Sequence, residues 1–134
     1  MKKILRQTLE KIKEESGDFD ESFYLVNCLL DEYGENKLAS LLYREIDKSI
    51  DWNVIADLFN ILIWSTSDNG SQLIRETNKW LIEAEDIRKI KIALNLDVYP
   101  FKEQDKMERV LNDIKSKYPN LAGKCNSLIE SRQN

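Results

Sequence analysis

Residues 51–81, DWNVIADLFNILIWSTSDNGSQLIRETNKWL, decide the fold of this chain. In the first half, polar side chains form one narrow stripe at Asn53, Asp57 and Asn60, with the spacing i, i+4 and i+7. A helix that is apolar on its other sides belongs in the middle of a domain, and Asp51 can provide its N-cap. We expect its core residues to be Ile55, Leu58, Phe59 and Leu62. The second half has the apolar spacing of an amphipathic helix, at Leu73, Ile74, Thr77, Trp80 and Leu81. The stretch therefore predicts a helical hairpin with a buried first arm.

Three helices are predicted ahead of the hairpin from the same periodicity. The first covers about 2–16 and the second about 20–33, and Gly17 and Gly34 supply the left-handed residues that end them. Asn36 can cap the third helix. The inward-facing residues are expected to be Ile4, Leu5, Leu9, Ile12, Phe23, Val26, Leu29, Leu30, Tyr33, Leu38, Leu41, Leu42, Ile46 and Ile50.

Three more helices are predicted after the hairpin, at about 86–96, 103–118 and 120–131. The segment LDVYPF cannot stay helical, because Pro100 restricts the residue before it. We expect this segment to place one apolar side chain against the core, from Val98, Tyr99 or Phe101. The inward-facing residues of the three helices are expected to be Ile87, Ile90, Ala93, Leu94, Met107, Val110, Leu111, Ile114, Tyr118, Leu121, Cys125, Leu128 and Ile129.

The sequence predicts an all-α fold. No stretch has the strict alternation of a half-buried strand, and glycine and proline together number only six. We expect a single domain over residues 1–134, with seven or eight helices arranged as a compact bundle or as a short α-solenoid-like array. No internal repeat register decides between these two arrangements.

The residue types exclude most kinds of catalytic site. The chain has no histidine, only two distant cysteines and only four glycines, so it lacks a Ser-His or Cys-His triad, a closed zinc site and a phosphate-binding glycine loop. We therefore expect no enzyme, no metal and no cofactor. A pair of carboxylates acting as acid and base stays open as an alternative, although no spacing among the 24 acidic residues singles one out.

Cysteines and tryptophans are expected to serve packing. Cys28 and Cys125 lie among apolar positions of predicted helices, where a free thiol packs as a small hydrophobe. Trp52, Trp64 and Trp80 are expected in the core rather than in a stacking platform for a ligand.

The charge balance limits the kinds of partner. A net charge of −4 argues against a nucleic-acid or anionic-membrane surface, since both need concentrated Lys and Arg, and it permits a basic protein partner. The charged N-terminal stretch lacks the apolar core of a signal peptide, and the longest apolar run, at 61–64, is too short to span a membrane. We therefore expect a cytoplasmic protein.

The most unusual feature is an acidic interval at residues 14–35. It contains eight carboxylates and no Lys or Arg, whereas positions 1–13 hold five basic residues and one acidic residue. Asp31 and Glu32 fall in the last turn of a predicted helix, where they oppose the macrodipole by about 0.3–1 kcal/mol each. Such a placement suggests a partner, although a charge run is more often a solvated surface. The candidate partner-binding residues of the interval are Asp18, Asp20, Glu21, Asp31, Glu32 and Glu35.

The polar connection at 65–71 is a reserve candidate. It surrounds Asn69 and Gly70, which tolerate positive φ, with small polar residues. One interpretation is a turn that caps the next helix. The other is a contact loop, in which Asp68 and Asn69 would touch a partner.

Two runs carry a family resemblance. ILIWSTSDNG at 61–70, followed by IKIALNLDVYPF at 90–101, resembles the bacterial immunity proteins of the immunity protein 30 family. The likeness covers about residues 51–115. It implies a small cytosolic α-helical protein that binds one toxin domain of a contact-dependent growth-inhibition or polymorphic toxin system and blocks it. The resemblance transfers no binding residue.

The residue-level interpretation and the resemblance lead to one expectation. The chain would neutralise a cognate, basic toxin C-terminal domain by covering its active-site face, and it would bind neither nucleic acid nor membrane. A helical adaptor without a toxin partner would have the same composition and is the alternative.

Overall fold

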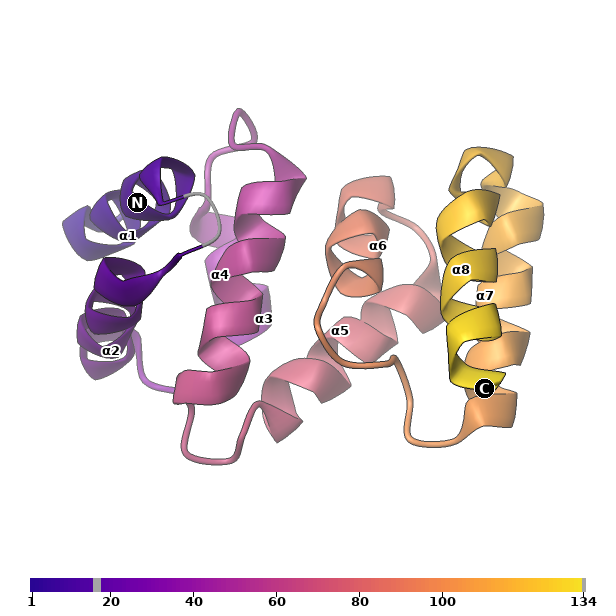
Figure 1. Cartoon of the computed structure of the whole chain (residues 1–134). Coiled ribbons are helices and arrows are strands. Elements are labelled where there is room, and N and C mark those ends of the chain that lie inside the picture. Colours follow the sequence, from indigo (N-terminus) through magenta and orange to yellow (C-terminus); the bar gives the residue numbers. More distant parts are fainter. Residues whose placement is uncertain (16–17, 134) are drawn as a thin grey trace. The chain divides into compact units, whose positions relative to one another are not determined.

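The computed structural model describes residues 1–15 and 18–133, and within them it has eight α-helices, one 3-10 helix and no strand (Figure 1). The elements are α1 (Lys3–Glu14), α2 (Asp20–Tyr33), α3 (Leu38–Glu45), α4 (Trp52–Ser65), α5 (Ser71–Glu83), α6 (Ile87–Leu94), α7 (Gln104–Lys117), η1 (Pro119–Leu121) and α8 (Ala122–Gln133). The all-α prediction is confirmed. The expected end of the first helix at Ser16 and its stop at Gly17 lie outside the described residues.

The chain divides into two compact units, Met1–Glu76 and Thr77–Asn134, and the division falls within α5. Buried apolar side chains are present in both units. We refer to them as unit 1 and unit 2. A single domain over the whole chain stays a prediction.

Unit 1 is built on α4. Helices α1 and α2 contact each other and both contact α4, as Figure 1 shows. Ile55, Leu58, Phe59 and Leu62 of α4 are fully buried, which confirms the expected core of the hairpin's first arm. The predicted N-cap position at Asp51 is also confirmed, although its side chain accepts no capping hydrogen bond.

The prediction that all three tryptophans belong to the core is wrong for Trp64. Trp80 is buried and Trp52 is half-buried, but Trp64 is 70% exposed. The physical reason is its helical position: Trp64 follows Asp57 by seven residues and Asn60 by four, so it continues the polar stripe of α4.

Two other residues expected to face inward are exposed. The buried residues of α2 are Ser22, Val26 and Leu29. Phe23 follows Ser22 by one residue and therefore lies at the edge of this buried face, with 39% of its surface exposed. Ile87, which is 37% exposed, is the first residue of α6. Side chains tilt toward the N-terminus of a helix, so the side chain of a first residue projects beyond the helix end.

The expected cap of α3 by Asn36 is also wrong. Lys37 occupies the N-cap position in the left-handed region, with φ 50°, and makes no side-chain cap. The first backbone N–H groups of α3 are held from α5 instead. Ala39 N and Ser40 N donate to the two carboxylate oxygens of Glu76, at 3.1 and 3.2 Å. A carboxylate distant in the chain thus satisfies donors that a helix start leaves without partners.

Unit 2 packs α6, α7 and α8 around a second buried cluster that includes Leu81, Ile90, Met107 and Cys125. Of the three residues expected to reach the core from the LDVYPF segment, Phe101 is buried in this cluster, although it holds a positive φ of 62°. Arg132 fixes the segment, because its guanidinium donates to the carbonyls of Pro100, Phe101 and Lys102 at 3.1, 3.0 and 2.6 Å.

Both cysteines are free thiols, as expected. Cys125 is buried, and the burial raises the pKa of its thiol. Within residues 1–15 and 18–133, no helix is long and apolar enough to cross a membrane.

Replacing Phe59 by Ala should lower the free energy of unfolding by about 3–5 kcal/mol, because it removes a fully buried ring from the centre of unit 1. Trp64→Ala on the same helix is the matched control and should change stability by less than about 0.5 kcal/mol. Denaturant unfolding followed by circular dichroism measures both. Equal losses for the two variants would contradict the assigned faces of α4.

Candidate functional site

Some carboxylates of the chain accept hydrogen bonds from backbone N–H groups, and these are distinct from the carboxylates that could bind a partner. The first N–H groups of each helix lack acceptors within the helix, so side-chain oxygens near a helix start are bound to the fold itself. Glu76 at α3 is one such group. The acidic interval contains two further carboxylates of this kind, Glu15 and Glu35.

Glu15 is the first of these structural carboxylates. It lies outside α2, yet Oε1 accepts hydrogen bonds from Ser22 N at 2.8 Å and from Ser22 Oγ at 2.6 Å, and Oε2 accepts one from Glu21 N at 3.2 Å. The hydrogen bond from the Ser22 hydroxyl is the main cause that lowers the pKa of the Glu15 carboxyl. Glu15 therefore caps α2, whose N-cap residue Phe19 offers no side-chain oxygen.

Glu35 is the second. Its carboxylate accepts from Ser67 Oγ at 2.8 Å and from Ser67 N at 3.1 and 3.2 Å, so the segment after α2 is tied to the turn between α4 and α5. Two predicted candidate regions, the end of the acidic interval and the 65–71 connection, are thus brought together. Glu35 is only partly exposed and serves this connection, which makes it a poor choice for steering a partner.

The 65–71 turn is itself ordered by hydrogen bonds. Asp68 Oδ1 accepts from Gly70 N at 3.1 Å, and Oδ2 accepts from Gln72 N at 3.0 Å, the bond that contributes most to lowering the Asp68 pKa. Gly70 has φ 78°, and a Cβ there would lie 3.0 Å from the Ile63 backbone. Asn69, also left-handed with φ 54°, is exposed at the tip. The geometry matches the interpretation of a turn that caps the next helix.

Tyr33 is the last residue of α2. Its hydroxyl donates to Glu45 Oε1 at 3.0 Å, and the Lys2 ammonium lies 4.5 Å from the centre of its ring. Burial and the Glu45 carboxylate raise the pKa of Tyr33 to about 12. Glu45 is therefore another carboxylate that accepts a hydrogen bond within unit 1.

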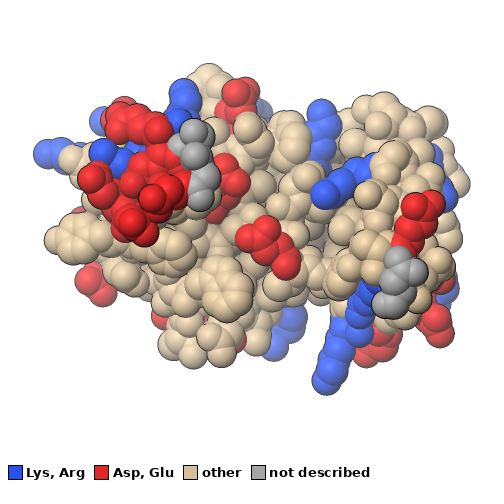
Figure 2. Space-filling view, viewed as in Figure 1, with Lys and Arg blue, Asp and Glu red and all other residues tan. Residues whose placement is uncertain are grey.

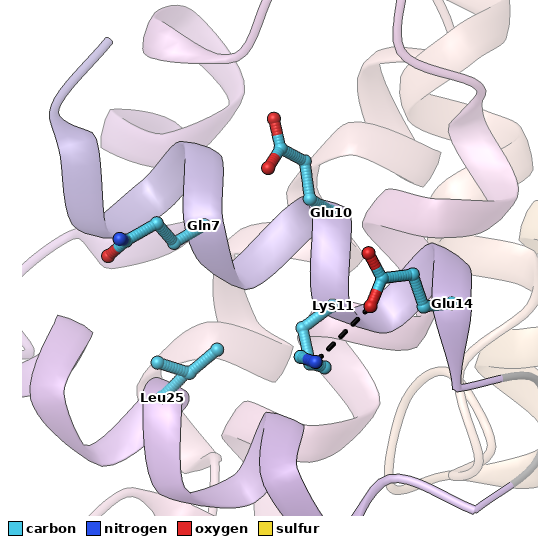
Figure 3. Close-up of a pocket in the computed structure, with 5 residues that line it drawn as sticks. All are labelled: Gln7, Glu10, Lys11, Glu14 and Leu25. Carbon is cyan, nitrogen blue, oxygen red and sulfur yellow. Dashed lines mark ion pairs between the residues drawn. The ribbon is translucent and has the colours of Figure 1, made fainter.

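A groove of about 250 Å³ between α1 and α2 is lined by Gln7, Glu10, Lys11, Glu14 and Leu25 (Figure 3). The Lys11 ammonium lies 3.2 Å from Glu14 and 2.9 Å from Glu21, and these two hydrogen bonds raise the Lys11 pKa. The cation that the carboxylates of the groove would attract is thus supplied by the chain. Within residues 1–15 and 18–133, no group of three or more His, Cys, Asp or Glu residues could hold a metal ion.

The carboxylates of the acidic interval that hold no hydrogen bond or ion pair within the described residues lie on and beside α2. Among the described residues, Asp18, Asp20, Asp31 and Glu32 are exposed and have no hydrogen bond or ion pair. Two exposed aromatic side chains, Phe23 at 39% and Tyr24 at 70%, accompany them. We define the outer face of α2 by those of its exposed residues that form no ion pair, Asp20, Phe23, Tyr24, Asn27, Asp31 and Glu32, which leaves out Glu21 because it pairs with Lys11. Acidic side chains gather over α1 and α2 at the upper left of Figure 2.

The structure separates the predicted acidic interval into two ends. Asp20 and Glu21 start α2, whereas Asp31 and Glu32 lie in its last turn. The two pairs are eleven residues apart along the helix, which corresponds to a rise of about 16 Å. Eleven residues also correspond to just over three full turns of the helix, so Asp20 and Asp31 share one side. The outer face of α2 therefore has acidic groups at both ends and aromatic groups between them.

Phe23 and Tyr24 were not identified from the sequence as part of a site. A signal for Tyr24 was present, because Asp20, Tyr24, Asn27 and Asp31 follow the spacing i, i+4, i+7 and i+11. That spacing places a tyrosine in the middle of a polar line. Phe23 lies close to the buried line of α2, and no comparable pattern indicates its exposure.

Comparison of the chain with protein-family models, curated proteins and solved structures gives no significant match. The candidate site is therefore assigned from the geometry and charges of its own residues.

Replacing Glu15 by Gln should lower the melting temperature, because a neutral amide is a weaker acceptor for the α2 donors. Since the folded-state pKa of Glu15 is lowered, its contribution is complete above the ordinary value of 4.5 and is lost as the pH falls through the folded-state pKa. The difference between variant and parent should accordingly shrink between pH 6 and the acid limit of folding, in thermal melts followed by circular dichroism.

Glu10→Gln is the control, because Glu10 is exposed on α1 and has no hydrogen bond or ion pair to another described residue. It should melt like the parent at each pH. A Glu15→Gln defect that is independent of pH would argue against the carboxylate cap.

Proposed function

We propose that this protein is an immunity-type inhibitor that binds a basic bacterial toxin domain through the outer face of α2. The observation that carries the proposal is the set of exposed carboxylates on and beside that helix, which form no hydrogen bond or ion pair with another described residue, together with the exposed ring of Tyr24. The resemblance of residues 61–70 and 90–101 to immunity protein 30 supplies the class of partner.

The charge distribution supports a basic partner. Unit 1 contains 15 Asp and Glu residues and 9 Lys and Arg residues, a net charge of −6, whereas unit 2 contains 9 acidic and 11 basic residues, a net charge of +2. The net negative charge of the chain thus comes from unit 1, which contains α2. Such a surface accelerates encounter with a positively charged protein and disfavours nucleic acid.

The proposed mechanism is competition for an anion-binding site. A toxin that acts on nucleic acid needs cationic groups where it holds phosphates. Asp20, Asp31 and Glu32 would approach those groups, and Tyr24 and Phe23 would supply the apolar contact area that a long-lived interface needs. Inhibition by this route needs no catalytic group on the immunity protein.

A helical adaptor without a toxin partner is the second candidate function. It would use the same exposed face of α2 for a different basic protein. The two functions predict different genetic surroundings, since an immunity protein is encoded beside a large secreted protein whose C-terminal domain is the toxin. Co-expression with that toxin domain should restore growth and allow the two proteins to be purified together if the immunity function is correct.

Replacing Asp31 and Glu32 by Lys should slow association with the toxin domain at least about tenfold at low ionic strength, because it reverses charge on the approach surface. The variant should stay folded, since lysines in the last turn favour the helix dipole by about 0.3–1 kcal/mol each. Stopped-flow or surface-based kinetics at low and high salt measure the effect, which should shrink as salt is added.

Asp113→Lys with Glu130→Lys is the control pair for this experiment. Both residues are exposed on helices of unit 2 and have no hydrogen bond or ion pair to another described residue, and the double variant changes the net charge by the same amount. If both pairs slow association equally, only net charge matters. If the α2 pair associates as fast as the parent, the outer face of α2 is not the approach surface.

A further inference from the structure

Tyr24 differs from other tyrosines of the chain in its surroundings. Tyr33, Tyr99 and Tyr118 each have a cation of the chain itself over the ring, with Lys2, Arg132 and Lys117 at 4.5, 5.2 and 5.6 Å from the respective ring centres. Tyr24 has no ring contact, hydrogen bond or ion pair to another described residue, and it is the most exposed of the tyrosines. Its ring is open on a helix that carries no basic residue.

The neighbours of Tyr24 favour a cation over its ring. Asp20 lies four residues before Tyr24 and is exposed on the same side of the helix, at the spacing that brings side chains within about 5–6 Å. Asn27 lies three residues after it and offers an amide oxygen. A planar guanidinium that stacks on the ring can therefore donate to the Asp20 carboxylate at the same time, which a lysine ammonium does less well.

We propose that Tyr24 receives an arginine side chain of the binding partner, stacked on the ring and hydrogen-bonded to Asp20. This inference rests on the proposed function for the identity of the partner, but the ring and the carboxylate can be tested without the toxin. It assigns a residue-level anchor to the outer face of α2, where the charges alone would only steer approach.

A first experiment uses hexa-arginine and hexa-lysine peptides as probes, titrated into the isotopically labelled protein and followed by amide chemical shifts. Hexa-arginine should shift α2 resonances around Tyr24 and bind more tightly than hexa-lysine. Tyr24→Phe, which keeps the aromatic face, should retain this preference, and Tyr24→Leu, which keeps apolar area without it, should lose it. Equal binding of the two peptides, or an unchanged preference in Tyr24→Leu, overturns the arginine assignment.

A second experiment uses the toxin domain encoded beside this protein. Tyr24→Leu should weaken binding about fivefold to thirtyfold, mainly through faster dissociation, and the loss should persist at high salt because a stacked contact is less screened than exposed charge. Trp64→Leu is the matched control, since Trp64 is an equally exposed aromatic residue on α4, and it should bind like the parent.

The outcomes separate the two proposals. If the parent binds hexa-arginine at Tyr24 but does not bind the toxin domain, the toxin function fails and the arginine anchor stands. If the parent binds the toxin domain and Tyr24→Leu binds equally well, the anchor fails and the toxin function stands. An equal loss in Trp64→Leu also overturns the anchor, because it would show a general dependence on exposed aromatic residues.

Discussion

The unsatisfied N–H groups at helix starts are the constraint on which much of this structure depends. A chain of short helices has many such starts, and each leaves donors that need an acceptor. Here carboxylates supply acceptors to four of the helices: Glu15 to α2, Glu76 to α3, Asp68 to α5 and Asp86 to α6. The same negative charge complements the positive end of each helix dipole. In this chain without histidine, acidic side chains thus accept many of the hydrogen bonds that connect one element to another.

This use of carboxylates divides the acidic residues by role. Glu15 and Glu35 belong to the acidic interval, yet they hold Ser22 and Ser67 in place. Asp20, Asp31 and Glu32 have no such duty among the described residues and remain available on α2. An acidic run is therefore not one functional unit. The proposed interface depends on the acidic residues that form no hydrogen bond or ion pair with another described residue, and on the exposed ring of Tyr24 between them.

Two exposed aromatic residues, Trp64 and Tyr24, lie in the polar lines of their helices. Trp64 continues the stripe of Asn53, Asp57 and Asn60, and Tyr24 lies in the line of Asp20, Asn27 and Asp31. Helical periodicity fixes the side of the helix on which a residue lies, whatever its hydrophobicity. Trp64 is exposed, contrary to the prediction, because its position on α4 and not its residue type sets the side of the helix on which it lies. The same position rule applied to α2 leads to the candidate anchor.

The sequence by itself determined the helices, the buried arm of α4 and the stop at Gly34, because periodicity, apolar content and a left-handed glycine act within a few residues. It also located the acidic interval. Only the tertiary structure decided which carboxylates are occupied. Asp86 caps α6 across two residues and Glu15 caps α2 across seven, but Glu76 reaches α3 across 37 residues. A contact of that length depends on how α3 and α5 pack, and no local pattern encodes it.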